Sequence, residues 1–269
     1  MDQPFRCRSI ARVAPLLCAA IALLGCAASR SADPRSTSRS LERELPAPKV
    51  IFFDVNETLL DLETMRASVG DALGGRRDLL PLWFSTMLHH SLVDNATGRY
   101  HNFGEIGVAA LLMVAESNGI DLTEAEAREA IVTPLRSLPP HPDVEDGLRE
   151  LKEQGFTLVS LTNSSNAGVL QQFENAGLLG YFDQRLSIED IRLYKPNRDA
   201  YRWAAKRMGV EPAEAMLVAA HGWDIAGAKA AGFQAAFVAR PGKVLYPLAD
   251  PPDLVVTTIP ELARELAGR

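Results

Sequence analysis

The chain has no cysteine beyond residue 26. Its three cysteines, Cys7, Cys18 and Cys26, all lie near the amino terminus. The rest of the protein therefore cannot form an internal disulfide, and it offers neither a thiolate nucleophile nor a cysteine metal site. Any catalytic group in the body of the chain must belong to another residue type.

An excess of positive charge is also absent. The formal net charge is -6 over 269 residues, of which 47% are hydrophobic. A dominant basic surface would need strong acidic compensation elsewhere, so we expect no nucleic-acid partner. Small anionic substrates need only a local positive site. The length suffices for one large domain, or for a core domain that carries a smaller insertion.

The apolar run near the amino terminus is too short for a comfortable membrane span. It reads VAPLLCAAIALLGC over residues 13–26 and follows three arginines. This order is typical of a secretory signal in residues 1–26, and LLGC resembles a bacterial lipobox in which Cys26 carries the lipid. We predict a bacterial protein exported to the periplasm, or a lipoprotein that meets the membrane only through Cys26. Plain export and a start site misplaced upstream of a cytoplasmic enzyme are the alternatives.

Short apolar runs alternate with helical stretches in the rest of the chain. Residues 27–47 are rich in Ser, Arg and Pro and predict a disordered linker. The helical stretches that follow often end on glycine. Alternation of this kind predicts an α/β fold, a Rossmann-like core with a doubly wound parallel sheet. The expected strands are residues 50–55, 157–163, 216–221, 234–240 and 253–258.

A long stretch without strand signals separates the first two expected strands. It spans about 100 residues, which is more than an ordinary crossover needs. We predict a core at residues 48–63 and 139–269 and an inserted helical cap at 64–138. Ligands bind at the carboxyl ends of parallel strands, so a cap there would close the site against water. The helical patterns within the cap are 64–75, 80–94, 103–118 and 123–137.

Polar side chains stand where the expected strands end. The stretch IFFDVNETLLD, residues 51–61, is a buried run that ends on Asp54. A single aspartate there is often a helix cap or a salt-bridge partner, but polar clusters at several neighbouring strand ends predict a site. The other clusters are Thr162 and Asn163, Lys195 in LYKPNRDAY, and His221 with Asp224.

These residues resemble a known set of motifs. Asp54 with Thr58, Thr162 in LTN, Lys195 in YKP and Asp224 in HGWD are similar, in order and spacing, to the four motifs of the haloacid dehalogenase-like hydrolase superfamily. The resemblance covers residues 48–268. Within that superfamily the chain resembles the type II 2-haloacid dehalogenase branch, because Tyr201 lies six residues after Lys195 and Trp223-Asp224 begins a helix.

The resemblance implies a mechanism. Asp54 would be a nucleophile that forms a covalent ester, and Lys195 would keep it ionised in a capped cleft. Thr58 and Thr162 would orient Asp54 by hydrogen bonds, and Asp224 would help to deprotonate the water that hydrolyses the ester.

A second group of residues is expected at the substrate. Asn163 would hold the halide or the substrate carboxylate, and His221 could orient the water, although a purely structural histidine is almost as well supported. The remaining candidates are Tyr201, Asn56 and Phe84.

Asn56 separates two chemistries. Phosphatases with these motifs resemble one another in having a second aspartate at this position, which protonates the leaving alkoxide. An amide cannot do so, whereas a halide leaves without a proton. The last motif contains one acid, Asp224, whereas Mg²⁺ is usually coordinated by more oxygen ligands than one carboxylate supplies. We therefore predict an (S)-2-haloacid dehalogenase that needs no metal or cofactor and acts on a small organic haloacid.

Two departures from the family pattern leave alternatives open. The arginine that characterised 2-haloacid dehalogenases carry on a cap helix falls on Phe84 here, and the serine and asparagine before the last aspartate are Ala219 and His221. The alternatives are a phosphatase or phosphonate hydrolase of the same fold, and a catalytically idle envelope lipoprotein that binds a small acid. A homodimer is compatible with the sequence.

Overall fold

The structure is a computed structural model that describes residues 46–268. The predicted signal segment with Cys26, and residues 27–45 of the predicted linker, lie outside the described residues. Within residues 46–268, no helix combines the length and the apolar character needed to cross a membrane.

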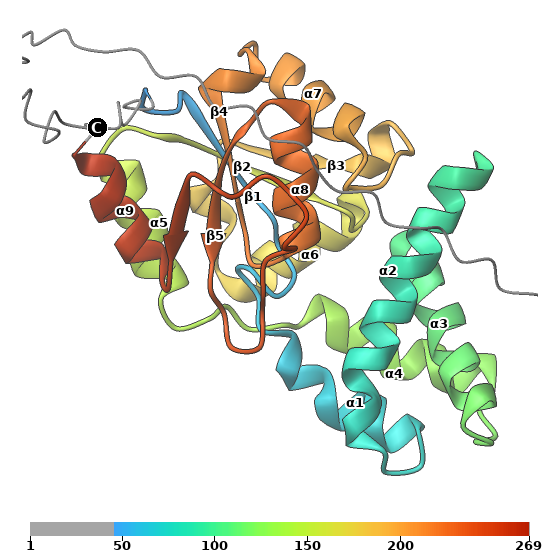
Figure 1. Cartoon of the computed structure of the whole chain (residues 1–269). Helices are drawn as coiled ribbons and strands as arrows, with labels where there is room; N and C mark the ends of the chain where they lie inside the picture. Colours follow the sequence, from blue (N-terminus) through green and yellow to red (C-terminus); the bar gives the residue numbers. More distant parts are fainter. Residues whose placement is uncertain (1–45, 269) are drawn as a thin grey trace, which may run out of the picture. The chain divides into compact units, whose positions relative to one another are not determined.

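The core is a parallel sheet of six strands in the order β3-β2-β1-β4-β5-β6 (Figure 1). All five pairings between neighbours are parallel. The central strands are buried on both faces, which explains why their sequences are unbroken apolar runs. The predicted doubly wound α/β fold is confirmed. The strands are β1 (Val50–Phe53), β2 (Thr157–Thr162), β3 (Gln184–Ser187), β4 (Ala215–Ala219), β5 (Gln234–Val238) and β6 (Leu254–Val256).

One edge strand, β3, was not predicted. Its sequence is QRLS, and only its last two residues are buried. Edge strands of this kind are short and polar, so they carry no apolar run for a sequence pattern to reveal.

Helices cover both faces of the sheet. The chain crosses from β1 through α5 (Val144–Glu153) towards one edge, and later through α7 (Arg198–Arg207) and α8 (Gly222–Ala231) towards the other. Right-handed crossovers in opposite directions place the two sets on opposite faces. On one face α5 packs against α9 (Ile259–Ala267) so closely that a Cβ on Gly147 would lie 2.5 Å from the Ile259 side chain. The other core helices are α6 (Asn166–Ala176), α7 (Arg198–Arg207) and α8 (Gly222–Ala231).

The strand order reverses beside β1. Phe53 pairs in register with Ser160 of β2 on one side and with Val218 of β4 on the other. The backbone N–H of Asp54 continues this ladder with a 3.0 Å hydrogen bond to the Val218 carbonyl. The carboxyl ends of β1, β2 and β4 therefore meet at the switch point of the sheet, where α/β proteins bind ligands.

Four of the helices between β1 and β2, those that precede α5, lead away from this end of the sheet (Figure 1). They correspond to the four helical patterns seen in the sequence. Trp83 and Met87 are fully buried among them, and the Trp83 indole donates to the Gly107 carbonyl at 2.8 Å. The helices are α1 (Arg66–Ala72), α2 (Leu80–Thr97), α3 (Phe103–Ser117) and α4 (Glu124–Arg136), called the cap below.

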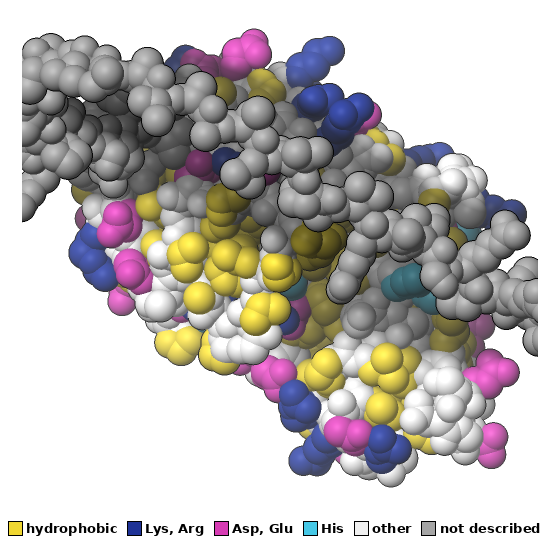
Figure 2. All heavy atoms as spheres, in the orientation of Figure 1, with side chains coloured by type: hydrophobic (Ala, Val, Ile, Leu, Met, Phe, Trp, Pro, Cys, Tyr) yellow, Lys and Arg dark blue, Asp and Glu magenta, His cyan; other side chains and the backbone are white. Residues whose placement is uncertain are grey.

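Large apolar side chains are exposed on the face drawn in Figure 2, over β5 and the segment that follows it. Val244 and Leu248 are 77% and 84% exposed. A homodimer, which the sequence allows, stays untested.

Arg240 is a buried residue that joins the loop after β1 to the segment before α5. Its guanidinium donates to the Thr58 carbonyl and, at 2.6 Å, to the carboxylate of Asp143, which in turn caps the backbone of Ile259. We expect Arg240→Met to lower the free energy of unfolding by about 2–4 kcal/mol, because it leaves a half-buried carboxylate unpaired. Urea unfolding measures this change. Arg149→Met, which breaks a solvent-exposed pair with Asp146, is the matched control and should leave the midpoint unchanged.

Candidate active site

Three charged side chains meet at the carboxyl end of β1. The Lys195 ammonium lies 3.0 Å from Oδ1 of Asp54 and 2.6 Å from Oδ2 of Asp224. All three side chains are buried. Asp54 directly follows β1, Lys195 precedes α7, and Asp224 lies in the first turn of α8. The fold thus brings together three residues that are far apart in the sequence, as the sequence predicted.

Burial and pairing set the charges of this cluster. Burial opposes ionisation of Asp54, but the Lys195 charge and hydrogen bonds from His221 and Thr58 hold its pKa well below the usual value. Burial also opposes the charge of Lys195, yet the two carboxylates raise its pKa. Asp224 differs, because burial outweighs the effect of Lys195 and raises its pKa. The cluster therefore holds one firmly ionised carboxylate and one that accepts a proton more readily.

Thr58 orients the nucleophile candidate. Its hydroxyl donates to Oδ2 of Asp54 at 2.7 Å and accepts from the backbone N–H of Ala220 at 2.9 Å. The hydroxyl proton is therefore directed at Asp54, as predicted. Because Ala220 follows β4, this hydrogen bond also ties the loop after β1 to the neighbouring strand.

Thr162 does not contact Asp54 in the way the sequence suggested. Its hydroxyl accepts from the backbone N–H of Ser164 at 3.1 Å, and no hydrogen bond to Asp54 is formed in the part of the chain that the structure describes. The register explains this, since Phe53 pairs with Ser160 and Thr162 lies beyond the level of Asp54. Here Thr162 shapes the turn that follows β2.

Asn163 and Tyr201, predicted at the substrate, support the charged cluster instead. The Asn163 side chain accepts from the backbone N–H of Lys195 at 3.0 Å. Tyr201 is fully buried and donates its hydroxyl proton to Oδ1 of Asp224 at 2.5 Å. Burial raises the pKa of Tyr201 well above its usual value, so it remains a donor. Their amide and phenol groups hold the lysine and the second carboxylate in place.

Asn56 joins the loop after β1 to the cap. Its amide donates to the Ser164 hydroxyl at 3.3 Å and accepts from Gln172 at 2.9 Å. Gln172 also donates to the Leu135 carbonyl at the end of α4. The amide of Asn56 is buried, and an amide is too weak an acid to transfer a proton to a leaving group.

His221 links Asp54 to an acid that the sequence analysis missed. Its Nδ1 lies 3.1 Å from Oδ2 of Asp54, and its Nε2 lies 2.7 Å from Oε2 of Glu57. Lys243 pairs with the other oxygen of Glu57. The one signal for Glu57 was its place in the stretch IFFDVNETLLD, three residues after Asp54, and Lys243 stands in a loop with no motif. Their roles depend on a loop conformation that residue spacing does not reveal.

The imidazole of His221 is cationic in this arrangement. Burial alone would lower its pKa, but hydrogen bonds to Asp54 and Glu57, together with their charges, raise it to about 9. Both ring nitrogens therefore act as donors at neutral pH. Phe84 of the cap and Trp223 of α8 stack on the ring, with centroids 6.0 Å and 5.0 Å away. Phe84, which stands at the position of the family's cap arginine, is itself uncharged but packs on the cationic ring of His221.

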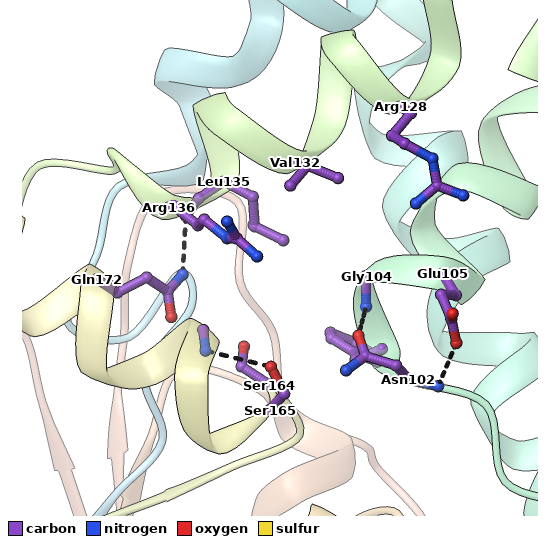
Figure 3. A pocket seen from close by; sticks show the side chains of 12 residues that line it. Asn102, Gly104, Glu105, Arg128, Val132, Leu135, Arg136, Ser164, Ser165 and Gln172 are labelled. Atoms are coloured by element: carbon purple, nitrogen blue, oxygen red, sulfur yellow. Dashed lines mark hydrogen bonds between the residues drawn. The ribbon is translucent and has the colours of Figure 1, made fainter. Parts of the chain in front are cut away.

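A cavity of about 250 Å³ lies between the cap and α6 (Figure 3), and two of its lining residues, Ser164 and Gln172, hydrogen-bond to Asn56. Figure 3 shows two cap arginines along one side and the start of α6 along the other. Ser164 lines the cavity and also bonds to Asn56, two residues after Asp54. The charged lining comes from Arg128, Arg136 and Glu105.

The position between the two carboxylates, where a metal ion would bind, is taken by the lysine ammonium group. The Lys195 nitrogen stands between the carboxylates of Asp54 and Asp224, where a cation shared by both would have to bind. Within residues 46–268, no group of three or more His, Cys, Asp or Glu side chains has a geometry that could hold a metal.

Fold and site together define a capped hydrolase with an α/β core, and comparisons with known proteins specify the family. The family model for haloacid dehalogenase-like hydrolases matches residues 48–232. The (S)-2-haloacid dehalogenase of Pseudomonas sp. (strain YL) is 31% identical over 225 residues, which are 82% of this chain and 97% of that protein. The chain belongs to the haloacid dehalogenase-like hydrolase family.

Solved structures agree. The L-2-haloacid dehalogenase of Xanthobacter autotrophicus superposes with a TM-score of 0.77 at 27% identity, covering 82% of this chain and 99% of that one. A second structure of that enzyme, with chloropropionic acid covalently bound, gives a TM-score of 0.77 at 26% identity and the same coverage.

Removal of the lysine should expose the repulsion that it suppresses. We expect Lys195→Met to lower the free energy of unfolding by about 3–5 kcal/mol at pH 7, because two buried carboxylates lose their shared cation. The loss should be smaller at pH 5, where one of the carboxyls takes up a proton. Urea unfolding at both pH values measures it. An equal loss at both would contradict the account, and Lys152→Met, at a surface pair, is the control.

Proposed function

We propose that the protein is an (S)-2-haloacid dehalogenase, which hydrolyses a carbon–halogen bond through an aspartyl ester and without a metal ion. The observation that carries the proposal is a firmly ionised carboxylate, Asp54, with a buried lysine at 3.0 Å and the amide of Asn56 in place of a proton donor. Such a site suits a leaving group that needs no proton.

The first step is displacement at carbon. Within residues 46–268, Oδ2 of Asp54 accepts hydrogen bonds from both Thr58 and His221, whereas Oδ1 accepts one, from Lys195. A carboxylate oxygen has two in-plane lone pairs. Oδ1 therefore keeps a free lone pair and attacks C2, the halide leaves with the bonding electrons, and the configuration at C2 inverts.

The second step is hydrolysis of the ester. A water molecule attacks Cγ of Asp54, and Asp224 takes its proton, in agreement with the raised pKa of Asp224. The released hydroxy acid recovers this proton as its C–O bond to Cγ breaks. A covalent intermediate is also supported by the Xanthobacter enzyme, in which chloropropionic acid is covalently bound.

The cavity between the cap and α6 supports a small organic acid as substrate. Arg128 and Arg136 line it and offer positive charge on the cap side. A volume of about 250 Å³ is large enough for a short-chain acid.

Halide release tests this proposal. We expect the purified protein to release halide from (S)-2-chloropropionate in EDTA, because Lys195 supplies the charge that a metal would supply. Asp54→Asn should lower kcat by roughly 1,000-fold or more, as expected when a nucleophile is removed. Halide is measured by ion chromatography, with Asp61→Asn as the control outside the cluster.

The absence of halide release from chloroacetate, fluoroacetate and both 2-chloropropionate enantiomers would contradict the proposed dehalogenase activity. Turnover of phosphate esters that depends on Mg²⁺ would indicate the phosphatase. A tightly held small acid in an inactive protein would indicate a binding role.

We also propose that the protein is exported and anchored through a lipid on Cys26. The order of basic, apolar and small residues before Cys26 supports this. Expression in a bacterial host should place the wild type in the membrane fraction with a lipid-modified first residue, detected by mass spectrometry. Cys26→Ser should remain unlipidated. A wild-type protein that keeps its full amino terminus in the cytoplasm would contradict export.

A further inference from the structure

Glu57 adopts a backbone conformation that its residue type disfavours. Its φ is 62°, in the left-handed region that glycine enters without strain. Side chains held in this region cluster at functional sites, where the surrounding structure fixes them. In this conformation the Glu57 carboxylate faces His221, and its Oε2 lies 2.7 Å from Nε2 of the imidazole. Its second oxygen pairs with Lys243.

The donors around Oδ2 of Asp54 have the geometry of an oxyanion site. The Thr58 hydroxyl lies at 2.7 Å and Nδ1 of His221 at 3.1 Å. Donors at 2.7–3.1 Å from an oxygen that gains charge are the usual means of stabilising a tetrahedral intermediate. Once Oδ1 carries the ester, Oδ2 is the carbonyl oxygen of that ester and receives the charge when water attacks.

We propose that His221, held cationic by Glu57, is a catalytic residue of the ester hydrolysis and stabilises the oxyanion on Oδ2 of Asp54 together with Thr58. The inference rests on the proposed function and adds a residue to it. Glu57 is a positioning residue, since it acts through the imidazole and not on the reacting atoms.

Hydrolysis of the Asp54 ester proceeds through a tetrahedral intermediate. Water forms a bond to Cγ, the carbonyl π electrons move to Oδ2, and Asp224 takes one water proton. The electrons on Oδ2 then return, the Cγ–Oδ1 bond breaks, and the leaving alkoxide takes the proton from Asp224. The new carboxyl group of Asp54 loses its remaining proton to solvent. His221 keeps its proton throughout and contributes charge and a hydrogen bond.

The surroundings of His221 explain why a second acid is needed. Its ring is faced by two charged groups, Asp54 and Glu57, while Phe84 and Trp223 cover it with uncharged rings. Esterification neutralises Asp54, so Glu57 becomes the one carboxylate that keeps the imidazole protonated at the stage where its charge is required. Lys243, on the far side of Glu57, weakens this effect.

A single-turnover experiment with (S)-2-chloropropionate separates the two steps. Halide release reports displacement, 2-hydroxypropionate reports ester hydrolysis, and the mass of the intact protein reports the ester. In the wild type we expect both products together. In His221→Gln we expect one equivalent of halide, accumulation of the ester and hydrolysis slowed by about 100- to 1,000-fold, as on loss of an oxyanion donor. Circular dichroism verifies that the variant is folded.

The pH dependence of ester hydrolysis tests Glu57. The rate should fall as the pH rises through the pKa of His221, because the cation is lost. Glu57→Gln lowers this pKa and moves the decline to lower pH, whereas Lys243→Gln raises it and moves the decline to higher pH. If Glu57 and Lys243 only stabilised the loop, the two substitutions would not shift the pH of the decline in opposite directions. His141→Gln is the matched control, since His141 bonds to the Glu57 carbonyl and does not contact Asp54.

Three results would overturn the inference. One is wild-type ester hydrolysis in His221→Gln while halide is released normally. Another is a rate that increases with pH through the His221 titration, which would make the neutral imidazole a base. The third is the absence of halide release by the wild type from every haloacid, which would remove the proposed function and this inference with it.

Discussion

The placement of one ammonium group between two buried carboxylates is the constraint on which the rest of the site depends. Lys195 reaches Asp54 at 3.0 Å and Asp224 at 2.6 Å, and none of the three has appreciable contact with solvent. Such a cluster is costly to bury unless every member is paired. The segments that follow β1, β3 and β4 must therefore converge, and they carry Asp54, Lys195 and Asp224 respectively. The hydrogen bonds of Asn163 and Tyr201 complete the pairing.

A second chain of charges, from Lys243 through Glu57 to His221, reaches the other oxygen of the same carboxylate. Asp54 therefore lies between two cations, which explains its low pKa and leaves Oδ1 as the oxygen with a free lone pair. Phe84 contributes from the cap by packing on His221. The departure from the family pattern at residue 84 is thus matched by the one at residue 221, because the aromatic ring covers the new imidazole.

Much of this could be predicted from the sequence. The unbroken run VIFF and its neighbours predicted the buried parallel strands, and the spacing of Asp54, Thr58, Lys195 and Asp224 predicted their convergence. The polar edge strand β3 carried no pattern. Glu57 and Lys243 could not be recognised, since their meeting depends on a residue at φ 62° and on a loop after β5. Tyr201 and Asn163 were assigned to the substrate because spacing gives proximity, whereas burial and hydrogen-bond partners assign them to Asp224 and Lys195.

The most direct test of the account is one turnover of (S)-2-chloropropionate in water labelled with heavy oxygen. Attack by Oδ1 of Asp54 on carbon, followed by attack of water on Cγ, predicts that the label appears in the Asp54 carboxyl group and not in the first hydroxy acid released. Mass spectrometry of the peptide that contains Asp54 measures the label. Heavy oxygen in the product and none in Asp54 would mean that water attacks the substrate directly, and would contradict the central claim.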